Sequence, residues 1–166
     1  MSEFEAVYLA HFEKVYRYVL SLCQNSALAE EITQETFCKA MEHMDQFDGK
    51  GRISTWLCQI AKNTYLSHYR KHKRLVPEAS GEDWAGTASD MEEAYLDRET
   101  ARTLHRLLHQ LREPYKEVFM LRTFGELPFG QIGEIFGKTD SWARLVFYRA
   151  KNELRRRLDE GDLSGN

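Results

Sequence analysis

Residues 128–158 have the sequence PFGQIGEIFGKTDSWARLVFYRAKNELRRRL, in which two segments with helical periodicity flank Gly137. The first is short and opens at Pro128. The second runs from Ser141 to about Leu158, and Asp140 or Thr139 would serve as its N-cap. A short helix, a glycine-containing turn and a longer helix are the elements of a helix-turn-helix. The alternative is a plain helical hairpin, but the glycine turn and the polar, basic face described next favour the helix-turn-helix.

The longer helix separates into two faces. Its packing face recurs at helical spacing and comprises Ala143, Val146, Phe147, Ala150 and Leu154. Its exposed face comprises Ser141, Arg144, Leu145, Tyr148, Arg149 and Asn152. Arginine and asparagine near the start of such a helix can contact base edges in the major groove of DNA. We expect the arginines at 155–157 to hold phosphates instead.

Residues 49–77 are strongly basic and hold seven Lys or Arg residues and no Asp or Glu, in a chain of net charge −3. Trp56, Tyr65, Tyr69 and Asn63 are interleaved with the basic side chains. Cationic groups beside aromatic rings suit a nucleic acid whose bases can be stacked upon. A solvated helix face is the alternative, but the aromatic content and the absence of acids over this length favour nucleic acid.

The basic residues gather on one side of a predicted helix that begins at Ser54 or Thr55 and ends near Lys73. Its core face would be Ile53, Trp56, Leu57, Ile60 and Thr64. Its opposite face would be Thr55, Gln59, Lys62, Asn63, Leu66, Tyr69, Arg70 and Lys73. An exposed Trp56 would be a stacking platform, but its spacing favours a place in the core.

Helical periodicity extends over most of the remaining chain. Helices are predicted over 3–24, from a Ser26 cap to about Met44, over 91–110, and from Pro114 to Gly125. In the second of these helices the residues expected to face inward are Leu28, Ile32, Phe37, Met41 and Met44. Residues from Pro77 to about Asp90 lack this period and are rich in Gly, Ser, Ala and acids, which predicts a flexible acidic linker. The fold class is therefore all-α, with two small helical domains (1–76 and 93–166) joined by a linker over 77–92.

Composition limits the possible functions. No run of apolar residues is long enough to span a membrane, and residues 1–5 lack the features of a signal peptide, so we expect a cytoplasmic protein. Three widely spaced cysteines argue against a disulfide framework. The pairs His68/His72 and His105/His109 have a spacing that can hold a metal, but neither has a third ligand on its face. No catalytic motif is legible, so we expect no metal, no cofactor and no enzyme activity.

Charge occurs in blocks along the chain. Residues 1–48 carry −6, residues 49–77 carry +7 and residues 78–100 carry −7. The acidic blocks should weaken binding to naked DNA, so a partner would be needed to add affinity.

Three segments resemble, in order and spacing, the extracytoplasmic-function sigma factors of bacterial RNA polymerase. Residues 29–40, AEEITQETFCKA, resemble the family's region 2.2. Residues 52–63, RISTWLCQIAKN, resemble regions 2.3 and 2.4. Residues 111–158 resemble region 4, including PYKEVF at 114–119 and YRAK at 148–151. The resemblance covers nearly the whole chain.

The resemblance implies a transcription initiation factor without catalytic activity. The first domain would dock on the clamp helices of the polymerase largest subunit through Glu31, Ile32, Gln34, Glu35 and Phe37. It would also melt and hold the −10 promoter element, with a flipped base entering the loop from Phe47 to Ser54. The −10 contacts would be Phe47, Lys50, Arg52, Lys62, Asn63, Tyr69, Arg70 and Lys73.

The second domain would bind the −35 element as duplex DNA. Its contacts would be Ser141, Trp142, Arg144, Leu145, Tyr148, Arg149 and Asn152. Trp142, Leu145 and Val146 depart from the family's common pattern, which leaves the −35 sequence open. Trp142 would either wedge against a phosphate or pack under the turn. Further implied partners are the polymerase flap and an anti-sigma factor, which could hold the protein at the membrane; no small-molecule substrate is implied.

Two other functions are compatible with helical domains. One is a helix-turn-helix regulator that does not associate with polymerase, although such a regulator needs no single-strand site in the third helix. The other is a structural adaptor, which would not depend on the charges of Arg144 and Arg149.

Overall fold

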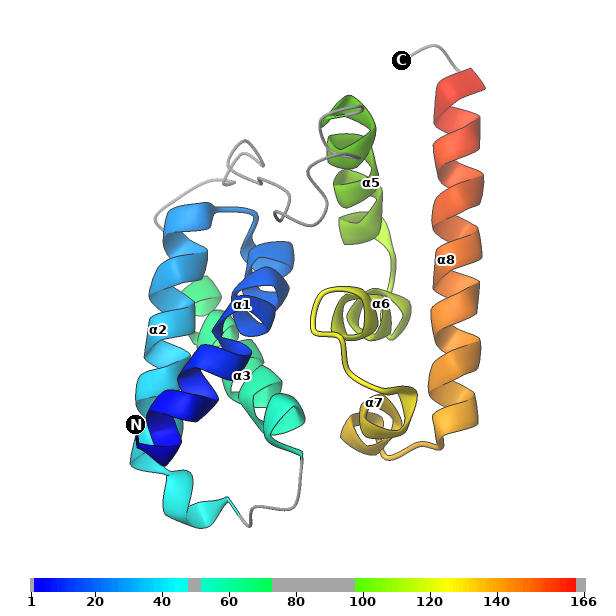
Figure 1. Cartoon of the computed structure of the whole chain (residues 1–166). Helices are drawn as coiled ribbons and strands as arrows, with labels where there is room; N and C mark the ends of the chain where they lie inside the picture. Colours follow the sequence, from blue (N-terminus) through cyan, green and yellow to red (C-terminus); the bar gives the residue numbers. More distant parts are fainter. Residues whose placement is uncertain (1, 48–51, 73–97, 164–166) are drawn as a thin grey trace. The chain divides into compact units, whose positions relative to one another are not determined.

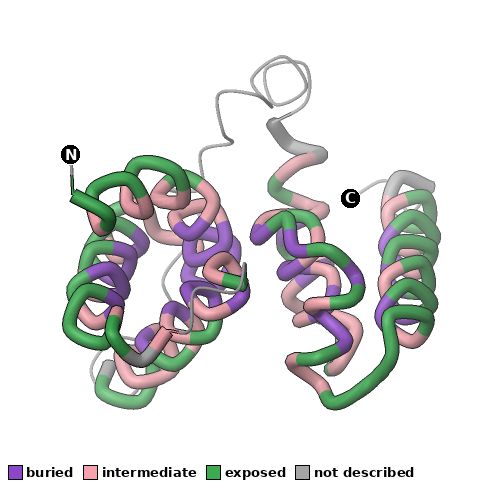
Figure 2. Tube along the Cα trace, turned by 60° about the horizontal axis from the view of Figure 1, so that its bottom comes forward, coloured by how far each residue is buried: buried purple, intermediate pink, exposed green. Residues whose placement is uncertain are grey.

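The computed structural model describes residues 2–47, 52–72 and 98–163, and every regular element within these ranges is helical. The helices form two compact units, one containing α1–α3 and the other α5–α8 (Figure 1). The all-α prediction is confirmed. The whole predicted linker and the start of the predicted 91–110 helix lie outside the described residues. In both units the buried positions face neighbouring helices and the exposed positions cover the outside (Figure 2).

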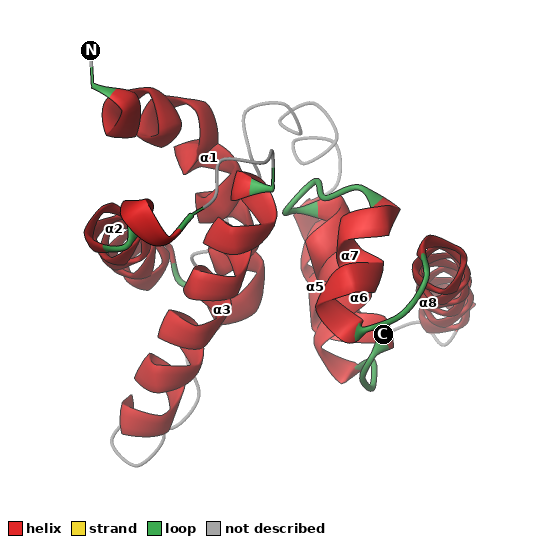
Figure 3. Cartoon of the chain, turned by 90° about the horizontal axis from the view of Figure 1, so that it is seen from below, coloured by secondary structure: helices red, strands yellow, loops and turns green. Residues whose placement is uncertain are grey.

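The first unit contains α1 (Glu3–Cys23), α2 (Ser26–Glu42), a short 3₁₀ helix at Met44–Gln46 and α3 (Ile53–His72) (Figure 3). The N-cap of α2 is Asn25, whose Oδ1 accepts a hydrogen bond from the Leu28 N–H at 2.9 Å. The predicted Ser26 cap was therefore one residue late. Asn25 is the N-cap because its backbone is extended and its side-chain amide oxygen reaches the first turn, as a cap requires.

The core of the first unit forms where the three helices meet. Its largest fully buried side chains are Tyr18, Phe37, Ile32 and Leu57. Tyr8 extends this core, because its ring lies 5.1 Å from that of Phe37 in an edge-to-face arrangement. The prediction that Ile32 and Phe37 face inward is confirmed. The same prediction for Met41 is wrong, since this side chain is 54% exposed near the end of α2.

A polar cross-link joins α2 to α3. The Glu35 carboxylate lies 3.0 Å from His68 Nε2 and 3.1 Å from Lys39 Nζ. Lys39 also donates to Thr64 Oγ1 on α3, at 3.1 Å. The hydrogen bond with His68, and then that with Lys39, holds the pKa of Glu35 below its usual value. This cross-link therefore favours the charged carboxylate in the folded state.

The second unit contains α5 (Arg98–Gln110), α6 (Tyr115–Thr123), α7 (Phe129–Phe136) and α8 (Asp140–Leu163). The packing face predicted for α8 is confirmed at four positions: Ala143, Val146, Ala150 and Leu154 are buried, and Phe147 is half-buried. Of the two proposed caps, Thr139 is correct, because its Oγ1 accepts from the Trp142 N–H at 3.1 Å. α8 continues past the predicted end at Leu158.

The turn between α7 and α8 depends on two glycines. Gly137 has the left-handed φ of +67°, and the Gly137 and Lys138 N–H groups donate to Glu134 O and Gly133 O in the pattern of a Schellman cap. Gly133 allows the turn to approach closely, because a Cβ there would lie 2.6 Å from Thr139 O. The predicted helix-turn-helix geometry is thus present, with its turn packed against the backbone of α7.

We predict that Gly133→Ala destabilises the second unit by about 1–3 kcal/mol, because its new methyl group meets backbone atoms that cannot move without opening the turn. Denaturant unfolding of the full chain measures this. Gly130→Ala is the matched control on the same helix, since its Cβ would meet only Asp140 Cβ at 4.0 Å. Equal stability of the two variants would contradict the close-packing account.

A second prediction concerns acid stability. A lowered Glu35 pKa contributes stability above the carboxyl group's unfolded pKa, and this contribution is lost as the pH falls through the folded value. Glu35→Gln should therefore be less stable than the parent near neutral pH and should lose less stability on acidification. Urea unfolding between about pH 7 and pH 3 measures this. Glu31→Gln is the control, because it removes an exposed carboxylate of the same helix that lies outside this cross-link.

Candidate nucleic-acid interface

The face of α8 predicted to meet DNA is exposed. Leu145 and Tyr148 are each 49% exposed, although both are large side chains. The polar members of this face are likewise exposed: Ser141, Arg144, Arg149 and Asn152. The helix thus presents cationic, amide, hydroxyl and apolar groups together, which suits contacts with base edges and thymine methyl groups.

Arg144, in the second turn of α8, is held from two sides. Its guanidinium lies 3.5 Å from the Asp140 carboxylate and 5.0 Å from the centre of the Phe129 ring. Arg122 lies over the same ring at 4.1 Å. Since Phe129 is 93% buried and fixed in the core, it is a rigid platform for the arginine. A side chain positioned in this way loses less conformational freedom when it binds.

Trp142 lies near the start of α8 but is only half-exposed. Its ring packs 5.3 Å from that of Phe136, at the end of α7. Of the two roles considered from the sequence, packing under the turn is the one that this contact favours. The −35 contact proposed for Trp142 stays a prediction.

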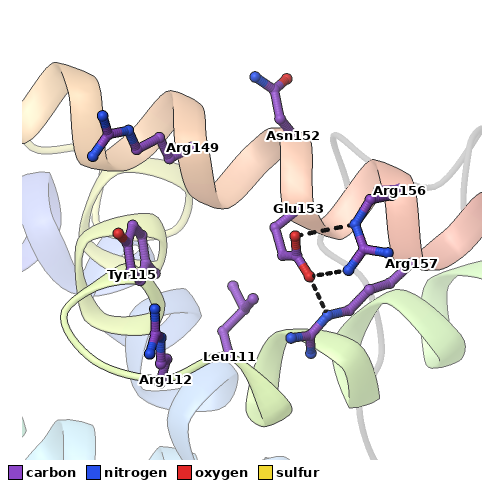
Figure 4. Close-up of a pocket in the computed structure, with 8 residues that line it drawn as sticks. All are labelled: Leu111, Arg112, Tyr115, Arg149, Asn152, Glu153, Arg156 and Arg157. Carbon is purple, nitrogen blue, oxygen red and sulfur yellow. Dashed lines mark hydrogen bonds and ion pairs between the residues drawn. The ribbon is translucent and has the colours of Figure 1, made fainter.

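A pocket lies between the second half of α8 and the turn that joins α5 to α6 (Figure 4). Arg149 lines it from α8, Arg112 lines it from the turn and Tyr115 lines it from the first residue of α6. Asn152 borders the pocket, with its side chain pointing away from the other lining residues (Figure 4). Arg112 and Tyr115 were not among the site residues predicted from the sequence. Helical periodicity relates residues within one helix, so it could not show that the α5–α6 turn lies beside α8.

One side of this pocket carries a carboxylate held by two arginines. Glu153 accepts hydrogen bonds from Arg156, at 2.6 and 3.2 Å, and from Arg157, at 2.7 Å (Figure 4). The bonds from Arg156, followed by the bond from Arg157, lower the pKa of Glu153 to about 2. Arg156 also donates to Glu160 at 2.6 Å. Arg156 and Arg157, two of the three arginines expected to hold phosphates, are thus paired with carboxylates of α8 itself.

The predicted −10 face on α3 is largely exposed. Arg52, Gln59, Asn63, Tyr69 and Arg70 are exposed, and Lys62 is half-exposed. Thr55 is a correction, because it is only 7% exposed and belongs to the buried side of the helix. Lys50 and Lys73 lie outside the described residues.

An aromatic pair lies near the start of α3. The rings of Phe47 and Trp56 stack at 5.2 Å with an interplanar angle of 25°, and both residues are half-buried. The expectation that Trp56 is a core side chain therefore holds only in part. Further along α3, the Tyr65 and Tyr69 rings lie 6.1 Å apart. Tyr69 is 51% exposed, so a nucleic-acid base can reach part of this side chain.

Two of the five residues predicted to bind polymerase are buried in the structure. Ile32 is fully buried and Phe37 is 2% exposed, so neither can contact a partner while the helix stays packed. Both side chains fill the core between α1, α2 and α3. Glu31 and Gln34 are exposed and Glu35 is half-exposed, and these three remain as candidates.

Within the described ranges, no group of three His, Cys, Asp or Glu residues could hold a metal ion. No helix in the described part of the chain is long and apolar enough to cross a membrane.

Comparison with known protein families matches both units. Residues 7–75 match Sigma-70 region 2 and residues 101–154 match Sigma-70, region 4. The chain is 29% identical to RNA polymerase sigma factor YlaC of Bacillus subtilis, over 93% of this chain and 91% of that protein. It is 26% identical to the ECF RNA polymerase sigma factor SigM of the same organism, over 95% and 96%.

Solved structures share the fold. The sigma factor RpoE, in complex with the anti-sigma factor NepR from Bartonella quintana, has a TM-score of 0.74 at 21% identity, covering 96% of this chain and 98% of that one. CnrH, in complex with the cytosolic domain of CnrY, has a TM-score of 0.67 at 19% identity, covering 95% and 88%. With regions 2 and 4 matched over most of its length, the chain belongs to the sigma-70 family, in its extracytoplasmic-function class.

Proposed function

We propose that this protein directs promoter-specific transcription initiation as a subunit of bacterial RNA polymerase. The observation that carries the proposal is the presence of two exposed polar and basic helical faces, on α3 and α8, within matched regions 2 and 4. A regulator that only binds duplex DNA would need the α8 face alone. The proposed domains are 1–76 and 93–166, with 77–92 as the linker. As a regulatory subunit, the protein would have no enzyme activity of its own and would act in the cytoplasm, where transcription occurs.

The α3 face would hold the separated strand of the −10 element. Tyr69 offers a ring for stacking, and Asn63 offers an amide to a base edge. Arg52, Lys62 and Arg70 supply cations for phosphates, together with Lys50 and Lys73 outside the described residues. Stacking contributes roughly 1–3 kcal/mol per base, and extrusion of a base costs a few kcal/mol. A stack and one or two phosphate contacts are therefore of the size needed to offset the extrusion of one base.

The α8 face would lie in the major groove of the −35 element. Residues near the start of a recognition helix contact base edges, and Arg144 occupies such a position. Its support by Asp140 and Phe129 favours one orientation of the guanidinium. Tyr148 and Leu145 add ring and methyl contacts, and Arg149 and Asn152 add polar contacts one turn further along.

The partners follow from the family. Glu31, Gln34 and Glu35 on α2 would face a basic helical surface of the polymerase clamp, where opposite charges guide association. The second unit would meet the polymerase flap. Two relatives of this fold were solved in complex with an anti-sigma factor or a cytosolic domain, which supports an anti-sigma partner here.

Transcription with purified components tests the proposed function. The full chain is added to core RNA polymerase on genomic DNA fragments, and the new transcript starts are mapped. The proposal expects starts that share two conserved elements and are absent with core enzyme alone. A regulator of the alternative kind would bind DNA without creating any start, and that outcome would remove the sigma assignment.

We predict that Arg144→Ala weakens binding to the mapped −35 duplex by roughly 1–3 kcal/mol and relaxes base preference at one position. The reason is the loss of a bidentate contact to a base. Competition binding with duplexes substituted at each position measures both effects. Arg102→Ala, which removes the same charge from exposed α5, should leave base preference unchanged. Unaltered preference in Arg144→Ala would show that this residue does not read bases.

A further inference from the structure

The pocket between α8 and the α5–α6 turn has a volume of about 540 Å³ and lies within the second unit. This size falls in the range of small-ligand sites. Its lining is dominated by arginine, and buried Leu111 supplies an apolar patch. The residues that line it are Leu111, Arg112, Tyr115, Arg149, Asn152, Glu153, Arg156 and Arg157.

The charge of the pocket is unbalanced. Four arginines line it with one glutamate, a net formal charge of +3. Glu153 is committed to Arg156 and Arg157. Among the described residues, neither Arg112 nor Arg149 forms an ion pair with an acid. Two guanidinium groups on opposite walls are therefore available to an anion (Figure 4).

We propose that this pocket binds a phosphate group between Arg112 and Arg149. A guanidinium presents a planar fork of donors that matches phosphate oxygens. The Tyr115 hydroxyl supplies an additional donor. This assignment gives a ligand to Arg112 and Tyr115, which lie outside the recognition helix. It places Arg149 on a phosphate rather than on a base edge.

Two sources could supply the phosphate. One is the backbone of a duplex that lies along α8, in which case the α5–α6 turn adds a contact that fixes the duplex on the helix. The other is a free polyphosphate. The proposal does not depend on the proposed function, because phosphate binding is measured without polymerase.

Glu153 acts in this pocket as an internal competitor. Its carboxylate engages the forks of Arg156 and Arg157, which a bound phosphate would otherwise recruit. Removing its charge should release the Arg157 guanidinium group and leave Arg156 paired with Glu160 alone. Glu160 pairs with Arg156 from outside the pocket lining and so gives a matched charge control.

Binding of two probes to the full chain tests the proposal: inorganic tripolyphosphate, followed by calorimetry, and a mixed-sequence DNA duplex, followed by fluorescence anisotropy over a salt series. Arg112→Gln should weaken binding of at least one probe by roughly tenfold relative to the parent. Arg106→Gln is the control, because it removes one exposed charge from α5 outside the pocket. Its effect should be less than about threefold.

Each outcome either identifies the source of the phosphate or refutes the proposed site. Loss of duplex binding alone, with a salt slope smaller by about 1, identifies the DNA backbone as the source. Loss of tripolyphosphate binding alone identifies a free anion, and loss of both identifies a shared site. Equal behaviour of Arg112→Gln and Arg106→Gln with both probes overturns the pocket, even where the protein still directs transcription with core polymerase.

Two further variants guard against a folding artefact. Tyr115→Phe keeps the ring and removes one donor, so the affected probe should bind roughly threefold to tenfold more weakly. Glu153→Gln should strengthen binding more than Glu160→Gln does, because only Glu153 lines the pocket. If Tyr115→Phe binds like the parent and the two glutamine variants are equal, the assignment is wrong.

Discussion

The close approach of the turn at 137–139 to the backbone of α7 is the constraint on which the DNA-facing unit depends. The left-handed Gly137 ends α7, and Gly133 lets Thr139 and Lys138 lie where a side chain would otherwise be. With the turn fixed, α8 begins at a set angle to α7, and its buried stripe from Ala143 to Leu154 packs against the unit's core. The exposed stripe of α8 then faces outward with no freedom to rotate about the helix axis.

The distribution of charge determines which faces of this geometry can attract a polyanion. The chain has a net charge of −3, yet the exposed polar faces of α3 and α8 are basic. Two acids in α8 pair with neighbouring arginines: Asp140 with Arg144, and Glu153 with Arg156 and Arg157. These pairs hold the arginines in place and moderate their attraction to polyanions. Affinity would then depend on two regions and a polymerase acting together, since linked sites gain from a high effective concentration.

Helical periodicity was enough to predict the helices and the packing face of α8, because the apolar spacing of amphipathic helices is set by burial. It could not rank neighbouring caps: Asn25, rather than Ser26, has the extended backbone that a cap needs. The resemblance placed Ile32 and Phe37 on a docking surface, whereas the periodicity placed them correctly in the core. For Met41 the periodicity was wrong: it placed this residue in the core, but an apolar residue near a helix end can remain exposed. The pocket at Arg112 and Arg149 depends on tertiary contacts and was not visible in the sequence.

The central claim is that α3 holds an opened strand while α8 holds closed duplex. Permanganate reactivity of thymines along a mapped promoter, with the protein bound to core polymerase, tests it most directly. The account predicts reactive thymines in the −10 element and unreactive ones in the −35 element, with Asn63→Ala and Tyr69→Ala reducing the −10 signal. Reactivity in both elements, or in neither while transcripts are still made, would contradict it.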